Sequence, residues 1–316
     1  RFRPDLVVYI GGHIVSKKLK SYLRSLKGVE QIRISQEADI EDTFMHLTKV
    51  MDLPNSDAMS WLDNFGWHNH WEDYRKLWMD ALAKSYERKE NFKPEFSSLA
   101  TVKEFFSQLQ KVEPQDFKAF TLGGKDAQDD GIYDRKFDTF LPGLMSSVIS
   151  GNSSAIRLMN LYADRHVYCN RGVNGIEGSL STAVGFSMCK NKSDKHVYCV
   201  LGDLSFFYDQ NALWNRNLNG KLRIIVLNNG GGAIFGKFQG LKESQAREEM
   251  VMAKHHATAE GICSQNDVKY LAAHTMEEME QGISQLIHAE SERPMLLEVF
   301  TDMDVDNEML EAIQKC

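Results

Sequence analysis

The stretch Val197-Tyr198-Cys199-Val200-Leu201-Gly202-Asp203-Leu204-Ser205 decides the fold, because an apolar run leads directly into a glycine and an acidic residue. Such a run predicts a buried strand that ends in a turn. A second apolar strand is predicted over 222–227, and it leads into Asn228-Asn229-Gly230-Gly231-Gly232. If the two strands are neighbours, an acidic and an amide side chain meet at one edge of a sheet.

The flanking sequence continues this alternation of strands and helices. Further strands are predicted over 6–10, 29–34, 166–169, 196–201 and 295–300. Helices are predicted from 17 to about 26 with Ser16 as the cap, over 101–109, before Gly151 and after Ser153, and over 178–188, 209–217, 244–255 and 276–288. Strands separated by helices predict parallel sheets with helices on both faces. The polar, glycine-containing segment 121–137 predicts a domain boundary, so we expect an α/β protein of two doubly wound domains, 1–137 and 138–316.

The composition excludes several classes of protein. The 316 residues include 37 Lys and Arg against 44 Asp and Glu, so the net charge is −7, which argues against a nucleic-acid-binding protein with a broad basic face. No apolar run approaches the roughly 20 residues needed to cross a bilayer. The five cysteines show no CxxC spacing, so we expect reduced thiols and a cytoplasmic protein.

The two polar strand ends together predict a site for a hard cation. Asp203 offers a carboxylate, Asn229 an amide oxygen and Gly231 a backbone carbonyl, which are the oxygen ligands that Mg²⁺ prefers. This small ligand set leaves coordination positions for a diphosphate, so the metal would bridge protein and ligand. Each segment alone is more often structural, as a helix cap or a turn. The pair is therefore the more specific signal.

Several segments resemble a known family. Gly202-Asp203-Leu204-Ser205 followed by Asn228-Asn229 is similar to the diphosphate-binding motif of thiamine-diphosphate enzymes. The blocks 151–158, 170–178, 202–209 and 228–235 resemble the 2-succinyl-5-enolpyruvyl-6-hydroxy-3-cyclohexene-1-carboxylate synthases of the menaquinone pathway, most strongly over 151–240. The resemblance implies a carboligase that decarboxylates 2-oxoglutarate and adds the succinyl unit to isochorismate. It implies thiamine diphosphate and Mg²⁺ (or Mn²⁺) as cofactors.

The resemblance also implies roles for individual residues. It places Ile176 beneath the cofactor as a stiff, β-branched support, and Ile234 and Phe235 as apolar walls near the thiazolium. The metal set that it implies is Asp203, Asn229 and the carbonyl of Gly231, and the cofactor-binding set is Ile176, Gly202, Asp203, Leu204, Ser205, Asn229, Ile234 and Phe235.

The resemblance further implies that Ser153, Arg157 and Arg171 bind substrate carboxylates, and a guanidinium fork suits that role because it matches a carboxylate. Lys17 is a further candidate for a substrate carboxylate, and an exposed helix lysine explains it as well. The glutamate that activates the cofactor would lie in an N-terminal pyrimidine-binding domain, and the chain begins at Arg1 without one. No catalytic residue is therefore assigned within the chain.

We expect the complete protein to be a homodimer or homotetramer, and this chain alone to bind cofactor weakly or not at all, without turnover. Two alternatives stay open at this point. One is another thiamine-diphosphate enzyme, such as an acetolactate synthase or a 2-oxo acid decarboxylase. The other is a non-catalytic nucleotide-binding module on a Rossmann-like sheet; a purely structural domain is the weakest alternative.

Overall fold

The computed structural model describes residues 2–12, 14–36, 40–64, 71–114, 145–172, 174–189, 195–237 and 244–315. The chain divides into two compact units, 1–87 and 88–316. The division precedes the predicted boundary segment 121–137, which lies outside the described residues. The boundary that we predicted at 137–138 therefore stays a prediction.

The first unit contains a three-stranded parallel sheet in the order β1-β2-β3. Its core holds Ile32 and Ile34 on one strand and Ala58 on a helix. The predicted strands near the N-terminus are confirmed, and so is the helix capped by Ser16, whose side chain accepts a hydrogen bond from Leu19 N at 3.2 Å. The elements are β1 (Leu6–Ile10), α1 (Lys17–Ser25), β2 (Glu30–Ser35), β3 (Lys49–Asp52), α2 (Asn55–Asn64) and α3 (Trp71–Asn91), which continues into the second unit.

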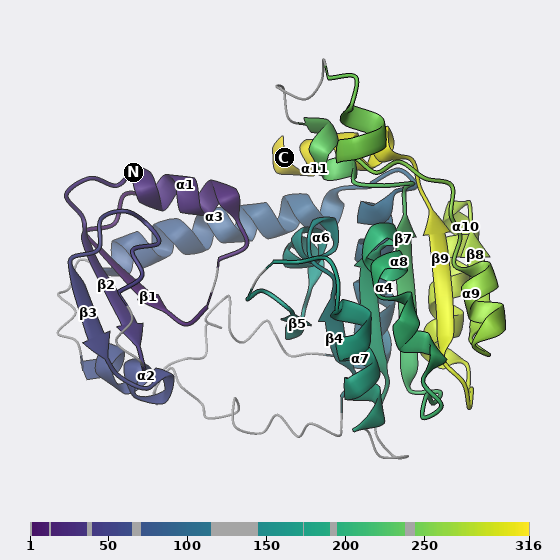
Figure 1. The fold of residues 1–316 in the computed structure, drawn as a ribbon. Coiled ribbons are helices and arrows are strands. Elements are labelled where there is room, and N and C mark those ends of the chain that lie inside the picture. The colour runs from purple at the N-terminus through teal and green to yellow at the C-terminus, as the bar shows by residue number, and fades with distance from the viewer. Residues whose placement is uncertain are drawn as a thin grey trace. The chain divides into compact units, whose positions relative to one another are not determined.

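The second unit is built on a six-stranded, all-parallel sheet in the order β5-β4-β6-β7-β9-β8 (Figure 1). Its strands are β4 (Ser147–Ser150), β5 (Val167–Cys169), β6 (Val197–Gly202), β7 (Leu222–Asn228), β8 (Lys269–Ala273) and β9 (Met295–Phe300). Its helices are α4 (Ser98–Val112), α6 (Ser154–Tyr162), α7 (Ser179–Met188), α8 (Asp203–Tyr208), α9 (Glu260–Gln265), α10 (Met276–His288) and α11 (Met303–Lys315). The predicted α/β class with parallel sheets is confirmed.

Alternate residues along the central strands point to opposite faces of the sheet, and each face has its own core. Tyr198 and Val200 of β6 pack on one side with apolar residues of α4, α6 and α10. Cys199 and Leu201 pack on the other side with residues of α7 and α9. Because both faces are covered, the central strands are mostly apolar, as is typical of a parallel sheet, and Arg223, Asn228 and Glu298 are their buried polar exceptions. All seven residues of β7 are buried.

The strand order reverses next to β6. From β4 the chain moves outward to β5, and it then returns to form β6 on the other side of β4 before continuing to β7. In open α/β sheets, ligands bind in the crevice at the carboxyl ends of the strands that flank such a switch point. The carboxyl ends here are Gly151 after β4 and Asp203 after β6, so the topology places the predicted site in that crevice.

Three predicted helices of this unit were wrong in type or extent. The segment before Gly151 is a strand, because Val148 and Ile149 are buried on opposite faces of the sheet. The helix predicted over 209–217 starts earlier, as α8 at Asp203, and a 3-10 helix follows over Gln210–Trp214. Within 244–255 only the five-residue π-helix Arg247–Val251 forms, and it buries no residue.

Candidate functional site

The tips of β6 and β7 lie side by side, as the sequence predicted. The two strands pair in parallel, with Gly202 opposite Leu227 at the end of the ladder. Asp203 follows Gly202 directly and is 3% exposed. Its Oδ1 accepts a hydrogen bond from Leu204 N at 2.7 Å, and its Oδ2 accepts one from Gly231 N at 2.8 Å. The Asp203 carboxylate therefore bridges the two strand tips.

The turn after β7 adopts a backbone conformation that only glycine tolerates. Gly230 and Gly231 have φ angles of 79° and 146°. A Cβ atom at Gly231 would lie 2.6 Å from Met252 O. This conformation presents the Gly231 N–H to Asp203, while the Gly231 carbonyl accepts a hydrogen bond from Ala233 N at 3.1 Å. One lone pair of that carbonyl is left for a further partner.

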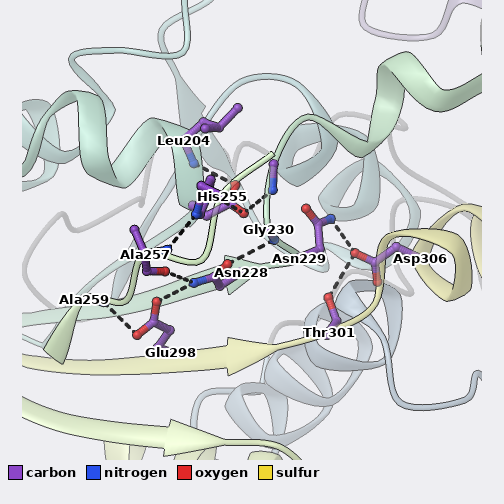
Figure 2. Close-up of polar contacts among 12 residues, drawn as sticks. Leu204, Asn228, Asn229, Gly230, His255, Ala257, Ala259, Glu298, Thr301 and Asp306 are labelled. Atoms are coloured by element: carbon purple, nitrogen blue, oxygen red, sulfur yellow. Dashed lines mark hydrogen bonds and ion pairs between the residues drawn. The ribbon is translucent and has the colours of Figure 1, made fainter. Parts of the chain in front are cut away.

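The two asparagines that end β7 have different partners (Figure 2). Asn228 is buried, and its Nδ2 donates to Glu298 Oε1 at 2.7 Å while its Oδ1 accepts from Gly230 N at 3.1 Å. Asn229 Nδ2 donates to Asp306 Oδ2 at 2.7 Å, and its oxygen lies on the side away from Asp306. Asn228 thus shapes the turn, and Asn229 keeps its amide oxygen for another ligand.

Asp306 itself is held by a dense set of donors. It accepts hydrogen bonds from Ser98 N and Ser98 Oγ, each at 2.7 Å, and from Thr301 Oγ1 at 3.1 Å, in addition to Asn229. Burial raises the pKa of the Asp306 carboxyl, and the hydrogen bonds from these residues oppose that rise. The residue joins α4, the end of β9 and α11 at one point.

His255 contacts the Asp203 carboxylate. It lies in the segment that follows the π-helix Arg247–Val251. Its Nε2 lies 3.3 Å from Asp203 Oδ2, without the alignment of a hydrogen bond. Its Nδ1 accepts from Ala257 N at 3.1 Å, which assigns the proton of the neutral ring to Nε2. The contact with Asp203 raises the pKa of His255, and burial opposes this effect. The helix that we predicted over 244–255 would end at this histidine, and that prediction was wrong, because the observed π-helix ends at Val251.

The donor set fits a hard divalent cation that is shared with a ligand. It consists of one buried carboxylate, one amide oxygen and one backbone carbonyl, all oxygen ligands of the kind that Mg²⁺ takes. Within the described ranges, no group of three or more His, Cys, Asp or Glu side chains gathers to hold a metal by itself. Asp203, Asn229 and Gly231 are therefore the residues that could hold Mg²⁺ together with phosphate oxygens.

On the other side of the switch point, Asn152 organises the segments that follow β4 and β5. It is 2% exposed, and its Nδ2 donates to Asn170 O and to Gly175 O. Its Oδ1 accepts from Arg171 Nη1 at 2.7 Å. One buried amide thus fixes both Arg171 and the backbone just before Ile176.

Arg157 and Arg171 form a positively charged patch in this crevice. Of the described Asp and Glu residues, none lies within ion-pair distance of either guanidinium. Burial lowers the pKa of Arg157, and the charge of Arg171 lowers it further. Arg171 Nε is buried without a hydrogen-bond partner, and Arg157 Nη1 donates to Ser153 O. Two neighbouring, partly buried guanidinium groups with no described carboxylate in ion-pair distance are typical of an anion-binding site.

The remaining predicted residues of the second unit lie in the segments that surround this crevice. Ile176 is half-buried, and its carbonyl accepts from Ser205 Oγ at 2.5 Å, so the support predicted for the cofactor is tied to α8. Ile234 and Phe235 lie in the short 3-10 helix Ala233–Lys237. Lys17 is exposed on α1 in the first unit, so its predicted role stays a prediction. A small cavity is lined among others by Ser154, Arg157, Asn229, Ile234 and Asp306, so it lies between one of the two arginines and one of the possible metal ligands.

Comparison with known proteins shows which class of protein domain this part of the chain resembles. Residues 150–299 match the family described as thiamine pyrophosphate enzyme, C-terminal TPP binding domain. That range contains the strand tips, the glycine turn and both arginines. This part of the chain is thus similar to the thiamine-pyrophosphate-binding domains of that family, the class that the motif after β6 resembles.

The particular relatives are synthases. The chain is 32% identical to the 2-succinyl-5-enolpyruvyl-6-hydroxy-3-cyclohexene-1-carboxylate synthase of Phocaeicola vulgatus, over 97% of this chain and 48% of that protein. The enzymes of the same name from Bacteroides thetaiotaomicron and Christiangramia forsetii are 32% and 33% identical, over 97% and 98% of this chain and 49% and 48% of their own lengths. The chain is therefore homologous to these synthases along nearly its whole length, and it spans about half the length of the curated relatives that it matches.

The structure also brings in residues that sequence reasoning missed. Asn152 was part of a quoted block, and nothing in the sequence indicated that its amide holds Arg171. Asp306 lies on α11, a helix that we did not predict.

No helix of the described residues is both long and apolar enough to span a membrane.

Proposed function

We propose that this chain is part of a thiamine-diphosphate- and Mg²⁺-dependent carboligase that decarboxylates 2-oxoglutarate and adds the succinyl unit to isochorismate. The observation that carries the proposal is the hydrogen bond of 2.8 Å from Gly231 N to Asp203 Oδ2, which ties the two motif segments together at the sheet edge. The homology to the synthases supports the choice of substrates. We also propose that the activating glutamate lies outside this chain and that the complete enzyme is a cytoplasmic homodimer or homotetramer.

In this proposal the protein residues hold and orient the reacting groups. Asp203, Asn229 and the Gly231 carbonyl hold Mg²⁺ (or Mn²⁺) and through it the diphosphate. Thiamine diphosphate, when bound, supplies the electron sink for loss of the substrate carboxylate. Gly202 is the N-cap of α8, and Leu204 and Ser205 lie in its first turn, so these residues would flank the diphosphate beside Asp203.

In the proposed enzyme, apolar residues support the cofactor and exclude water, and cationic residues bind the substrates. Ile176 supports the cofactor from below, held by Ser205, and Ile234 and Phe235 keep water away from the reacting carbon. Arg157 and Arg171 bind the carboxylates of the two anionic substrates, and Ser153 contributes a hydroxyl beside them. Ser153 has a φ angle of 68°, a strained conformation for a serine and one that is more frequent at functional sites.

Replacing Arg171 by alanine should impair substrate use while leaving cofactor binding intact. A charge-assisted hydrogen bond to a carboxylate contributes about 1.5–3 kcal/mol, so kcat/KM for one of the two substrates should fall roughly 10- to 150-fold. The assay needs protein that includes the proposed pyrimidine-binding domain. Arg216→Ala, at an exposed arginine of the same unit, is the matched control. Unchanged kinetics in Arg171→Ala and Arg157→Ala would favour another thiamine-diphosphate enzyme.

The proposed function is tested by measuring which substrates the enzyme consumes and which products it releases. With thiamine diphosphate and Mg²⁺, the enzyme should consume 2-oxoglutarate and isochorismate together and release carbon dioxide in equal amount. Decarboxylation without addition to isochorismate would support a 2-oxo acid decarboxylase instead. Binding of NAD by calorimetry, with no effect of thiamine diphosphate, would support the nucleotide-binding module.

A further inference from the structure

Asp306 lies on the C-terminal helix α11, far in sequence from both motif segments, yet it contacts one of the proposed metal ligands directly. Its Oδ2 accepts the hydrogen bond from Asn229 Nδ2 at 2.7 Å (Figure 2). The same carboxylate is anchored on Ser98 and Thr301. These contacts leave little freedom for the carboxylate, so the orientation that it imposes on Asn229 is well defined.

The orientation of an asparagine side chain decides whether it can bind a cation. One end of the amide is an acceptor oxygen and the other a donor NH₂ group. Mg²⁺ takes oxygen ligands, and an NH₂ group turned toward it would repel it. An ionised carboxylate can only accept hydrogen bonds, so Asp306 can only face the NH₂ end. The Asn229 oxygen consequently lies on the opposite side (Figure 2).

We propose that Asp306 is a positioning residue for the metal site, because its contact with Asn229 Nδ2 holds the amide so that Oδ1 faces the cation. The inference rests on the proposed function, in which Asn229 is a metal ligand. It adds a role for the C-terminal helix, which contributes no residue to the predicted metal, cofactor or substrate sets. Residues of this kind typically affect metal affinity roughly 10- to 100-fold when they are replaced.

The variant Asp306→Asn should turn the Asn229 amide around. The backbone N–H of Ser98 requires an acceptor at the Oδ1 position, so the new NH₂ group should occupy the Oδ2 position and face Asn229. Asn229 would then offer its oxygen to residue 306 and its NH₂ group to the cation. We expect Mn²⁺ affinity in the presence of thiamine diphosphate to fall roughly 10- to 100-fold, measured from the free-Mn²⁺ electron paramagnetic resonance signal at millimolar concentrations that keep weak binding measurable.

Asp306→Ala separates positioning from packing. Alanine leaves the Asn229 amide free to rotate, so it should weaken Mn²⁺ binding less than the near-isosteric asparagine, which holds the amide the wrong way round. A role in packing alone predicts the reverse order, because alanine removes more contacts. Thr301→Val is the matched control, since it removes one hydrogen bond to Asp306 and none to Asn229, and it should leave Mn²⁺ affinity unchanged.

A double-mutant cycle with Asn229→Asp gives the sharpest test. A carboxylate at position 229 presents oxygen in either orientation, so Asp306→Asn should no longer weaken Mn²⁺ binding in that background. An equal loss with asparagine and with aspartate at position 229 would overturn the inference, and so would an unchanged affinity in the Asp306→Asn single variant.

A second readout does not depend on the metal. In protein labelled with ¹⁵N-asparagine, the side-chain amide protons of Asn229, assigned by their absence in Asn229→Asp, should move upfield in Asp306→Asn and stay in place in Thr301→Val. Unmoved protons in Asp306→Asn would overturn the inference. If unsubstituted protein that includes the proposed pyrimidine-binding domain showed the carboxylate-bonded amide but bound no Mn²⁺ with thiamine diphosphate, the metal site of the proposed function would fail, and the positioning role would fail with it.

Discussion

Asp203→Asn is expected to remove metal-dependent cofactor binding almost completely. The substitution keeps the size of the side chain but removes the only charged ligand of the proposed metal set. Because the loss of a residue that merely orients a ligand already weakens binding roughly 10- to 100-fold, the loss of this ligand should weaken Mn²⁺ binding by more than about 100-fold. The measurement is the Mn²⁺ titration in the presence of thiamine diphosphate.

The same variant should also lose stability. Asp203 accepts backbone hydrogen bonds from Leu204 and Gly231 on its two oxygens, and asparagine has only one oxygen for them. One N–H would face an NH₂ group in a buried place, at a cost of about 1–3 kcal/mol in the free energy of unfolding.

Asp209→Asn is the matched control. Asp209 is also buried and accepts two hydrogen bonds, from Ser181 N and Ser181 Oγ, and it is not part of the proposed site. It should lose less stability, because the Ser181 hydroxyl can turn to accept a hydrogen bond from the new NH₂ group, and it should keep Mn²⁺ binding. If Asp203→Asn bound Mn²⁺ as tightly as Asp209→Asn, Asp203 would not be a metal ligand.

Gly231→Ala is expected to have the largest effect on the fold of the site. At a φ angle of 146°, an L residue is strained by about 1–3 kcal/mol, and the new Cβ atom would lie 2.6 Å from Met252 O, a backbone atom that cannot move away alone. We expect the free energy of unfolding, measured in urea, to fall by about 2–4 kcal/mol. Displacement of the Gly231 N–H from Asp203 should weaken Mn²⁺ binding in the same variant.

Gly185→Ala provides the contrast for this prediction. Gly185 lies inside α7, and a Cβ atom there would meet nothing within 4 Å. Alanine has a higher helix propensity than glycine. The free energy of unfolding of this variant should therefore rise by about 0.5–1 kcal/mol, and it should bind Mn²⁺ normally. Equal stability losses in both variants would mean that the Gly231 turn is not the constrained feature that the structure indicates.

The central part of the fold could be predicted because its determinants are local. The runs that form β6 and β7 are almost entirely apolar, since parallel strands are buried on both faces, and each ends at a glycine or a polar residue. The helix over 276–288 and the strand over 295–300 were predicted with the bounds observed. Their apolar periodicity agrees with their burial.

Other elements depended on partners far away in the sequence. The segment before Gly151 is a strand because β5 and β6 pair with it on its two sides. The contact of His255 with Asp203 joins residues 52 positions apart, and that of Asp306 with Asn229 joins residues 77 positions apart. Neither contact leaves a local pattern in the sequence. The proposed metal ligands Asp203 and Asn229 could therefore be identified from sequence motifs. The residues that contact them, His255 and Asp306, could be identified only from the structure.

The most direct test of the account is a crystal structure of the protein with thiamine diphosphate and Mn²⁺, with the ion located by its anomalous scattering. The account predicts one ion bound by a carboxylate oxygen of Asp203 and by Oδ1 of Asn229, each at about 2.0–2.2 Å, with diphosphate oxygens completing its coordination. An ion located elsewhere, or one that contacts only one of these two side chains, would contradict the account.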